Sequence, residues 1–134
     1  MTWKIAFQTE IRGFEPETSS SKKLKRKKEL KKALSAKIGK QYENILKRVI
    51  GRELFIDVIF YLYQSEQTGS SKKDLDNLQK ILLDVLSVNM VNGQGKLRGL
   101  GFLRDDSEIF KIHCEKKLVN DPKNRGLDLK ISYK

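Results

Sequence analysis

The run of ten residues at positions 54–63, LFIDVIFYLY, places the tightest limit on what this chain can fold into. Nearly all of its residues are β-branched, aromatic or aliphatic, a composition that is typical of strands. Its apolar character is almost continuous rather than alternating, so the run predicts a central strand that is covered on both faces. The rest of the fold is therefore expected to form around a sheet that has this strand in its interior.

Periodicity elsewhere in the sequence predicts the other elements. Alternation of apolar and polar residues predicts three further strands, at residues 2–11, 108–117 and 126–133. Apolar residues at three- and four-residue spacing predict two main helices, at residues 22–50 and 74–87. The order β-α-β-α-β-β predicts a single small α+β domain with a mixed sheet of about four strands.

Length and composition exclude several classes of protein. A chain of 134 residues normally makes one domain, and no stretch approaches the ~18 apolar residues of a membrane-spanning helix. The first residues lack the apolar core and cleavage site of a signal peptide, so we expect a cytoplasmic protein. The single cysteine, Cys114, excludes an intrachain disulfide and a cysteine-rich zinc site.

The positive charge is concentrated in the N-terminal part of the chain. Residues 1–50 carry 14 Lys and Arg against 5 Asp and Glu, which is +9 of the total +11. Such a chain is expected to bind a polyanion, nucleic acid first and an anionic membrane second. The residues expected to contact DNA phosphates are Lys22, Lys23, Lys25, Arg26, Lys27, Lys28, Lys72 and Lys73. The alternative is that these residues carry ordinary solvent-exposed charge. In that case the first six of them lie on an exposed helix face, or in a basic loop or arm at 13–28.

Acidic residues gather near the start of the second helix and just before the third strand. At about 100° per residue, Asp76, Lys80 and Asp84 share one exposed helix face, with Asp74 just ahead of it. If the acid pair at 105–106 meets the N-terminus of this helix, several carboxylates converge and require a cation such as Mg²⁺. Such an ion with a nearby lysine is suited to hydrolysing a phosphodiester. The alternatives are a helix cap, a favourable position in the helix dipole, and a simple turn.

Three short motifs resemble those of a known family. The sequence reads D-L-D-N-L-x-K at 74–80, D-x-L at 84–86 and G-F-x-x-D-D at 101–106. In this order the motifs are similar to the signature of the RusA-type Holliday-junction resolvases, small endonucleases of bacteria and their phages. The resemblance is strong over residues 74–112, and the order of elements is compatible elsewhere.

The resemblance implies an activity and the residues that perform it. Enzymes of this type resolve four-way DNA junctions by paired symmetric cuts in recombination and repair. They act as homodimers and depend on Mg²⁺, and Mn²⁺ is expected to serve as a substitute for it. By motif position, the essential residues correspond to Asp74, Asp76, Asp106 and Lys80, with Asp105 as a supporting acid. A two-fold dimer suits this reaction because it supplies two symmetric sites.

Two segments differ from the family pattern, and other functions stay open. A glycine-rich insertion occupies 89–101, and the loop at 13–18 lacks the Pro-Pro-Ser-x-Asn motif. Phe14 in that loop is a candidate for stacking on a base. The alternative functions are a non-catalytic DNA-junction or RNA-binding protein with a degenerate site, and a membrane-surface protein that uses the helix at 22–50.

Overall fold

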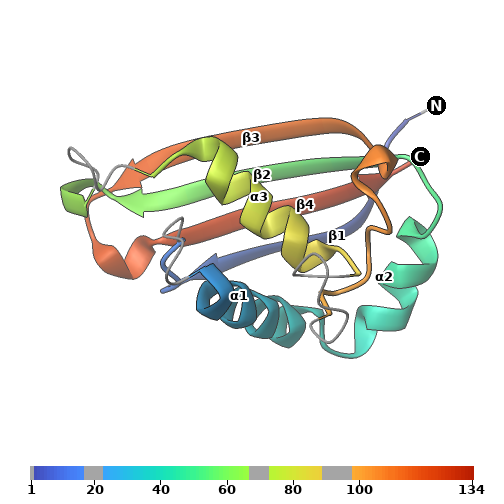
Figure 1. Cartoon of the computed structure of the whole chain (residues 1–134), viewed down its shortest axis with the longest axis horizontal. Helices are drawn as coiled ribbons and strands as arrows, with labels where there is room; N and C mark the ends of the chain where they lie inside the picture. The colour runs from blue at the N-terminus through green and yellow to red at the C-terminus, as the bar shows by residue number, and fades with distance from the viewer. Residues whose placement is uncertain (1, 17–22, 67–72, 89–97) are drawn as a thin grey trace.

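The computed structural model describes residues 2–16, 23–66, 73–88 and 98–134, and it shows a sheet with helices over one of its faces (Figure 1). The strands are β1 (Lys4–Arg12), β2 (Leu54–Tyr63), β3 (Ile109–Val119) and β4 (Gly126–Tyr133). The helices are α1 (Lys23–Ile38), α2 (Tyr42–Val49) and α3 (Leu75–Leu86). Short 3₁₀ turns lie at Gly39–Gln41, Gln64–Glu66, Asp106–Glu108 and Pro122–Asn124. No helix within these ranges is long and apolar enough to cross a membrane.

The order of the strands in the sheet is β1-β4-β2-β3. Strand β4 pairs antiparallel with both β1 and β2, whereas β2 pairs parallel with β3. A parallel pair needs a crossover connection, and α3 lies in the chain between these two strands. The structure therefore confirms the predicted α+β class, the order of elements, and a mixed four-stranded sheet with two main helices.

Strand β2 is central, as its sequence predicts, but helices cover only one of its faces. The residues on that face are at most 2% exposed: Leu54, Ile56, Val58, Phe60 and Leu62. The residues that alternate with them are half-buried. The prediction that both faces are covered is therefore wrong for the described part of the chain. Neighbouring side chains partly shield the second face, where Arg12 lies over the Tyr61 ring and Lys111 lies over the Phe55 ring.

The long helix expected at 22–50 is broken in its middle. Gly39 has a φ of +53°, a conformation that favours glycine, and it begins the 3₁₀ turn between α1 and α2. The buried apolar stripe nevertheless continues across the break, with Leu30, Leu34, Ile38, Ile45 and Val49. Residues 23–28, which were also expected as part of a basic loop or arm, form the first turns of α1. Residues 89–97 of the expected insertion lie outside the described residues.

Candidate active site

One pocket collects several of the residues that the motifs single out. It has a volume of about 280 Å³ and lies between the C-terminal half of α3 and the chain that leads into β3. Lys80 and Asp84 line it from α3, and Asp105 and Asp106 line it from the chain before β3. The structure thus brings the motif lysine to both members of the acid pair.

The acid pair is held beside α3 by the residues that precede it. Leu100, Phe102 and Leu103 are buried. The backbone N–H of Leu100 donates to the carbonyl of Val85 at 2.7 Å, and that of Phe102 donates to the carbonyl of Leu86 at 2.8 Å. The last carbonyls of a helix have no partners within the helix, so this segment caps α3. The capping fixes where the acid pair begins.

Glu108 organises the turn that carries the acid pair, although no sequence motif points to it. Its carboxylate accepts hydrogen bonds from the backbone N–H of Arg104 at 2.7 Å and from the Arg104 guanidinium at 3.3 Å. Burial alone would raise the pKa of Glu108, but the hydrogen bonds and charge of Arg104 hold this pKa below its usual value. The Ser107 hydroxyl also donates to Asp105 at 3.1 Å. The opposite charges of Arg104 and Glu108, four residues apart, are the sequence signal for this contact.

Asp74 and Asp76 lie at the N-terminal end of α3 and are not among the residues that line the pocket. Asp74 is the N-cap residue, but its exposed side chain makes no capping hydrogen bond, so the expected cap is not formed. Asp76 is exposed in the first turn of α3. Burial and, to a lesser extent, the charge of Asp76 raise the pKa of Cys114 on β3 to about 11.

The acid pair therefore meets the C-terminal half of α3, whereas the sequence suggested a meeting at its N-terminus. The reason lies in the segment at 99–103, which folds back directly over the end of the helix that the chain has just left. Ser87 and Leu103 form a parallel bridge there, and the N–H of Val88 donates to the Leu103 carbonyl at 3.0 Å. Lys80, halfway along α3, and Asp84 are the motif residues of this helix that line a pocket with the acid pair.

The donor atoms of the pocket suit a hard cation. Within the described ranges, no group of three or more His, Cys, Asp or Glu side chains is close enough to hold a metal ion. Mg²⁺, however, usually binds through one or two carboxylates and completes its octahedron with water and phosphate oxygens. Asp105 and Asp106 are therefore suitable ligands for a Mg²⁺ ion that would also bind a substrate phosphate. They do not form part of a preassembled three-carboxylate site among the described residues.

An ion pair whose Lys27 end is nearly buried joins the pocket to the basic helix α1. Nζ of Lys27 lies 2.8 Å from Oδ2 of Asp84, and the Lys27 side chain is 9% exposed. Lys27 lies one turn before Leu30 on the inner face of α1, where a charge is unfavourable unless it is paired. The structure thus gives Lys27 a protein partner, and its contact with DNA stays a prediction.

Glu15, to which no sequence pattern points, gathers three cations near the start of α3. Its carboxylate lies 3.3 Å from Nζ of Lys73, 3.4 Å from Arg26 and 3.6 Å from Arg125. The carbonyl of Lys73 accepts a hydrogen bond from Nζ of Lys116 at 2.9 Å. These contacts anchor the residue that directly precedes the D-L-D motif. Arg26 and Lys73 are 11 and 58 residues from Glu15 in the sequence, so only the fold reveals the cluster.

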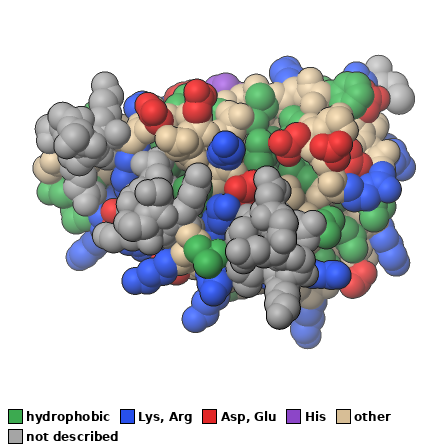
Figure 2. Space-filling model, in the orientation of Figure 1, with side chains coloured by type: hydrophobic (Ala, Val, Ile, Leu, Met, Phe, Trp, Pro, Cys, Tyr) green, Lys and Arg blue, Asp and Glu red, His purple; other side chains and the backbone are tan. Residues whose placement is uncertain are grey.

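The remaining predicted DNA contacts are placed only in part. Lys25 and Lys28 are exposed on α1. Lys22, Lys72 and the side chain of Lys23 lie outside the described residues. Phe14, the candidate for base stacking, is partly buried and packs against the core. Figure 2 shows Lys and Arg side chains along the lower edge of the molecule, around α1, and acidic side chains mainly above them.

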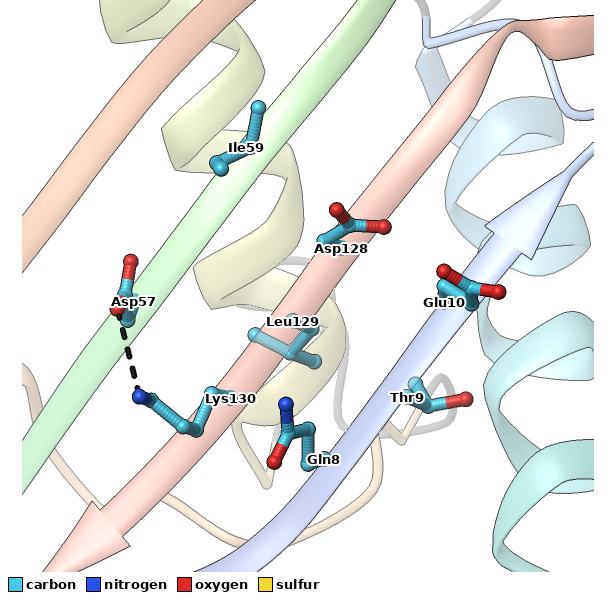
Figure 3. Close-up of a pocket in the computed structure, with 8 residues that line it drawn as sticks. All are labelled: Gln8, Thr9, Glu10, Asp57, Ile59, Asp128, Leu129 and Lys130. Atoms are coloured by element: carbon cyan, nitrogen blue, oxygen red, sulfur yellow. Dashed lines mark ion pairs between the residues drawn. The ribbon is translucent and has the colours of Figure 1, made fainter.

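A second hollow, of about 450 Å³, lies on the sheet face without helices, and Figure 3 views it with α3 behind the sheet. It is larger than the pocket at α3, but none of the predicted site residues lines it. Asp57 in this hollow lies 2.7 Å from His113 and 3.9 Å from Lys130, and Asp128 lies 2.8 Å from Arg12. These carboxylates already have cationic partners, so the α3 pocket is the better candidate for chemistry.

No protein-family model matches this chain, and comparisons with curated proteins and with solved structures give no match either. The likeness to the RusA-type resolvases therefore rests on the motif residues at 74–80, 84–86 and 101–106.

Proposed function

We propose that this chain is a Mg²⁺-dependent endodeoxyribonuclease that cleaves branched DNA, with four-way junctions as its substrate. The observation that carries the proposal is the pocket that Lys80 shares with Asp105 and Asp106. These residues come from two separate motifs, and an acid pair with a nearby lysine suits phosphodiester hydrolysis. Asp74 and Asp76, which the resemblance also makes essential, lie outside this pocket. The resemblance to RusA-type resolvases supports the same function.

Each residue of the pocket has a role that suits its chemistry. Asp105 and Asp106 supply hard oxygen ligands for Mg²⁺. When bound, this ion lowers the pKa of an attacking water and neutralises charge on the scissile phosphate. The exposed ammonium of Lys80 stabilises the negative charge that develops on the phosphate oxygens. Asp74 and Asp76 are the remaining motif acids, at the N-terminal end of the same helix.

Helix α1 is proposed to hold the phosphate backbone beside the pocket. Lys25 and Lys28 are exposed on this helix, and each phosphate that they neutralise adds to the salt dependence of binding. The ion pair between Lys27 and Asp84 ties this surface to the pocket, since it joins α1 to α3 at 2.8 Å. DNA that lies along α1 is thereby held in a fixed position relative to Lys80.

Two copies of the chain are proposed to act together. Resolving a four-way junction requires two symmetric nicks, and a two-fold homodimer supplies one active site for each. Sedimentation of the protein with and without a junction tests this point. A junction complex that contains one copy of the chain and still makes both cuts at once would contradict it.

The test of the activity is nicking of a synthetic four-way junction in Mg²⁺ by the wild type, Asp106→Asn, Lys80→Ala and Asp121→Asn. Asp121 is an exposed acid beyond the far end of β3, and asparagine can keep the bond that its side chain accepts from Lys123 at 2.9 Å. We expect wild type and the Asp121 variant to cleave equally, and the two site variants to bind but cleave about a hundredfold more slowly. Equal cleavage by all four proteins would refute the assigned residues.

A non-catalytic DNA-junction or RNA-binding function is the second candidate, and one observation favours it. Among the residues that the structure places, no set of three metal-ligating side chains is assembled. Tight junction binding without cleavage in Mg²⁺ or Mn²⁺ would assign the non-catalytic role. Tighter binding of a structured RNA than of the junction would assign RNA as the partner.

A further inference from the structure

One end of the sheet face without helices carries a group of aromatic, apolar and basic side chains. We call this group the aromatic platform, and its members are Trp3, Ile5, Phe55, Lys111 and Lys134. Phe55 alternates along β2 with the buried Leu54 and Ile56, so it faces away from the helices. The strand register places Ile5 opposite Ser132, Ser132 opposite Phe55, and Phe55 opposite Lys111. The row that runs through Ile5, Phe55 and Lys111 therefore crosses all four strands, with Ser132 of β4 between the first two.

The rings and ammonium groups of the platform are held against one another. The Trp3 and Phe55 rings have centroids 5.7 Å apart and are tilted by 60°. Nζ of Lys111 lies 4.7 Å from the centroid of Phe55, and Nζ of Lys134 lies 5.2 Å from that of Trp3. The backbone N–H of Lys134 donates to the Glu53 carbonyl at 3.1 Å, which fixes this residue beside the rings. Both lysines thus present positive charge at an aromatic surface.

The platform differs in chemistry from the middle of the same sheet face. The row that contains Glu10, Asp128 and Glu115 is acidic, and its charges are paired with neighbours such as Arg12 at 2.8 Å from Asp128. None of the five platform residues is acidic. Ile5 is 54% exposed, so the platform adds open apolar surface to its rings and cations. An anionic ligand with a flat apolar part fits this combination.

The platform lies close to the proposed active site along the chain. Asp106 lines the pocket on the helix side, and Lys111 follows five residues later on the opposite face. Five residues span at most about 18 Å even when fully extended. The exposed Phe110 lies between them at the outer strand β3, which is the edge of the sheet. A strand that leaves the pocket around this edge therefore reaches the platform within a few nucleotides.

We propose that the aromatic platform binds unpaired nucleotides of a DNA strand. Bases stack on Trp3 and Phe55, and the adjoining phosphates pair with Lys111 and Lys134. At a branched substrate, this surface holds single-stranded DNA that emerges beside the cleavage site. The inference goes beyond the proposed cleavage activity and rests on it only for the choice of DNA as the nucleic acid.

Trp3 is the single tryptophan of the chain, so its fluorescence reports on the platform alone. The test is a titration of the full chain in EDTA with short oligothymidylate, with an abasic oligonucleotide of equal length, and with a fully paired duplex. We expect oligothymidylate to quench Trp3 emission, while the abasic strand and the duplex bind without quenching it. Phe55→Leu, which keeps an apolar side chain at the position, should weaken oligothymidylate binding about five- to tenfold. Lys111→Ala should weaken it, and Lys117→Ala, on the same face of β3, serves as the matched control.

Several results would overturn the proposal. Trp3 emission that is unchanged by oligothymidylate, or quenched equally by the abasic strand, contradicts base stacking. Equal effects of Lys111→Ala and Lys117→Ala contradict a local site. A change in Trp3 emission with protein concentration alone, together with dimer formation, assigns the surface to a second copy of the chain. Because EDTA prevents cleavage, these outcomes are independent of whether the protein cuts junctions.

Discussion

Replacing Gly99 with alanine should separate the acid pair from the helix that carries Lys80. A Cβ atom at this position would meet the carbonyl oxygens of Ser87, Val85 and Asp84, and the last of these would be 2.9 Å away. All three contacts are closer than real Cβ atoms show, and all three are with backbone at the end of α3. The segment at 99–103 must therefore move away from the helix to make room for the methyl group.

The size of the effect follows from the hydrogen bonds that this movement breaks. The N–H groups of Gly99, Leu100 and Gly101 donate to carbonyls of Val88, Val85 and Ser87 at 3.0, 2.7 and 3.1 Å. Loss of three such bonds removes about 1.5–4.5 kcal/mol. Alanine returns about 0.4–1 kcal/mol by restricting the unfolded chain. The variant should therefore lose about 0.5–4 kcal/mol of unfolding free energy.

Urea unfolding followed by circular dichroism measures this loss. A change of about 2 kcal/mol lowers the midpoint by about 1 M for a small domain. Gly13→Ala is the control, since it adds the same methyl group where no atom lies within 4 Å and where φ is +75°. That variant should lose only about 1–2 kcal/mol from backbone strain. A Gly99→Ala midpoint equal to that of the wild type would show that the segment is not held against α3.

Three further predictions concern the Lys27–Asp84 ion pair, one core side chain and the thiol of Cys114. Asp84→Ala should lower the urea midpoint more than Lys27→Met does. Asp84→Ala leaves the nearly buried Lys27 ammonium without this carboxylate, whereas Lys27→Met leaves a carboxylate that water reaches. The reverse order would contradict the assigned burial. Leu34→Ala should cost about 2–5 kcal/mol in the same assay, since this side chain is fully buried, and a loss below 1 kcal/mol would argue against the packing of α1. At pH 8, iodoacetamide should alkylate folded Cys114 about a hundredfold more slowly than the unfolded thiol. A pKa of about 11 instead of 9.0 leaves about one-hundredth of the thiolate at this pH. Equal rates of alkylation would contradict the raised pKa. The raised pKa of this thiol stabilises the fold below about pH 9, and this contribution is lost as the pH rises towards 11.

Periodicity predicts most of the elements because each depends on neighbours in sequence. The bounds of β2 and β4 follow directly from their apolar residues, and the positions of α1 and α2 follow from one continuous stripe. The break at Gly39 is weaker in the sequence, since a single glycine is tolerated within many helices. The open face of β2 is harder still to predict, because half-burial by neighbouring strands and full burial under helices select similar residues.

The candidate site is predictable in composition but not in arrangement. The motifs identify Lys80, Asp105 and Asp106, which the structure brings to one pocket. They do not reveal that the acid pair meets the C-terminal half of α3, because this depends on how the segment after the helix folds back. Glu15 is missed for the same reason, since its contacts with Arg26, Lys73 and Arg125 exist only in the tertiary structure. Glu108 is missed although its contact with Arg104 is local, because no motif marks that pair.

The position of β4 in the sheet has a consequence for how the protein is made. This strand comes last of the four in the chain, yet it lies between β1 and β2. Arg12 and Leu127, which are joined by a hydrogen bond across β1 and β4, are 115 residues apart. During synthesis, strand β1 therefore has no partner until almost all of the other described elements have been made. Pairing between segments so distant in the sequence slows folding. A nascent chain cut short before Gly126 leaves β1 and β2 without the strand that joins them, so we expect the basic helix and the acid pair to become one folded surface only after β4 is in place.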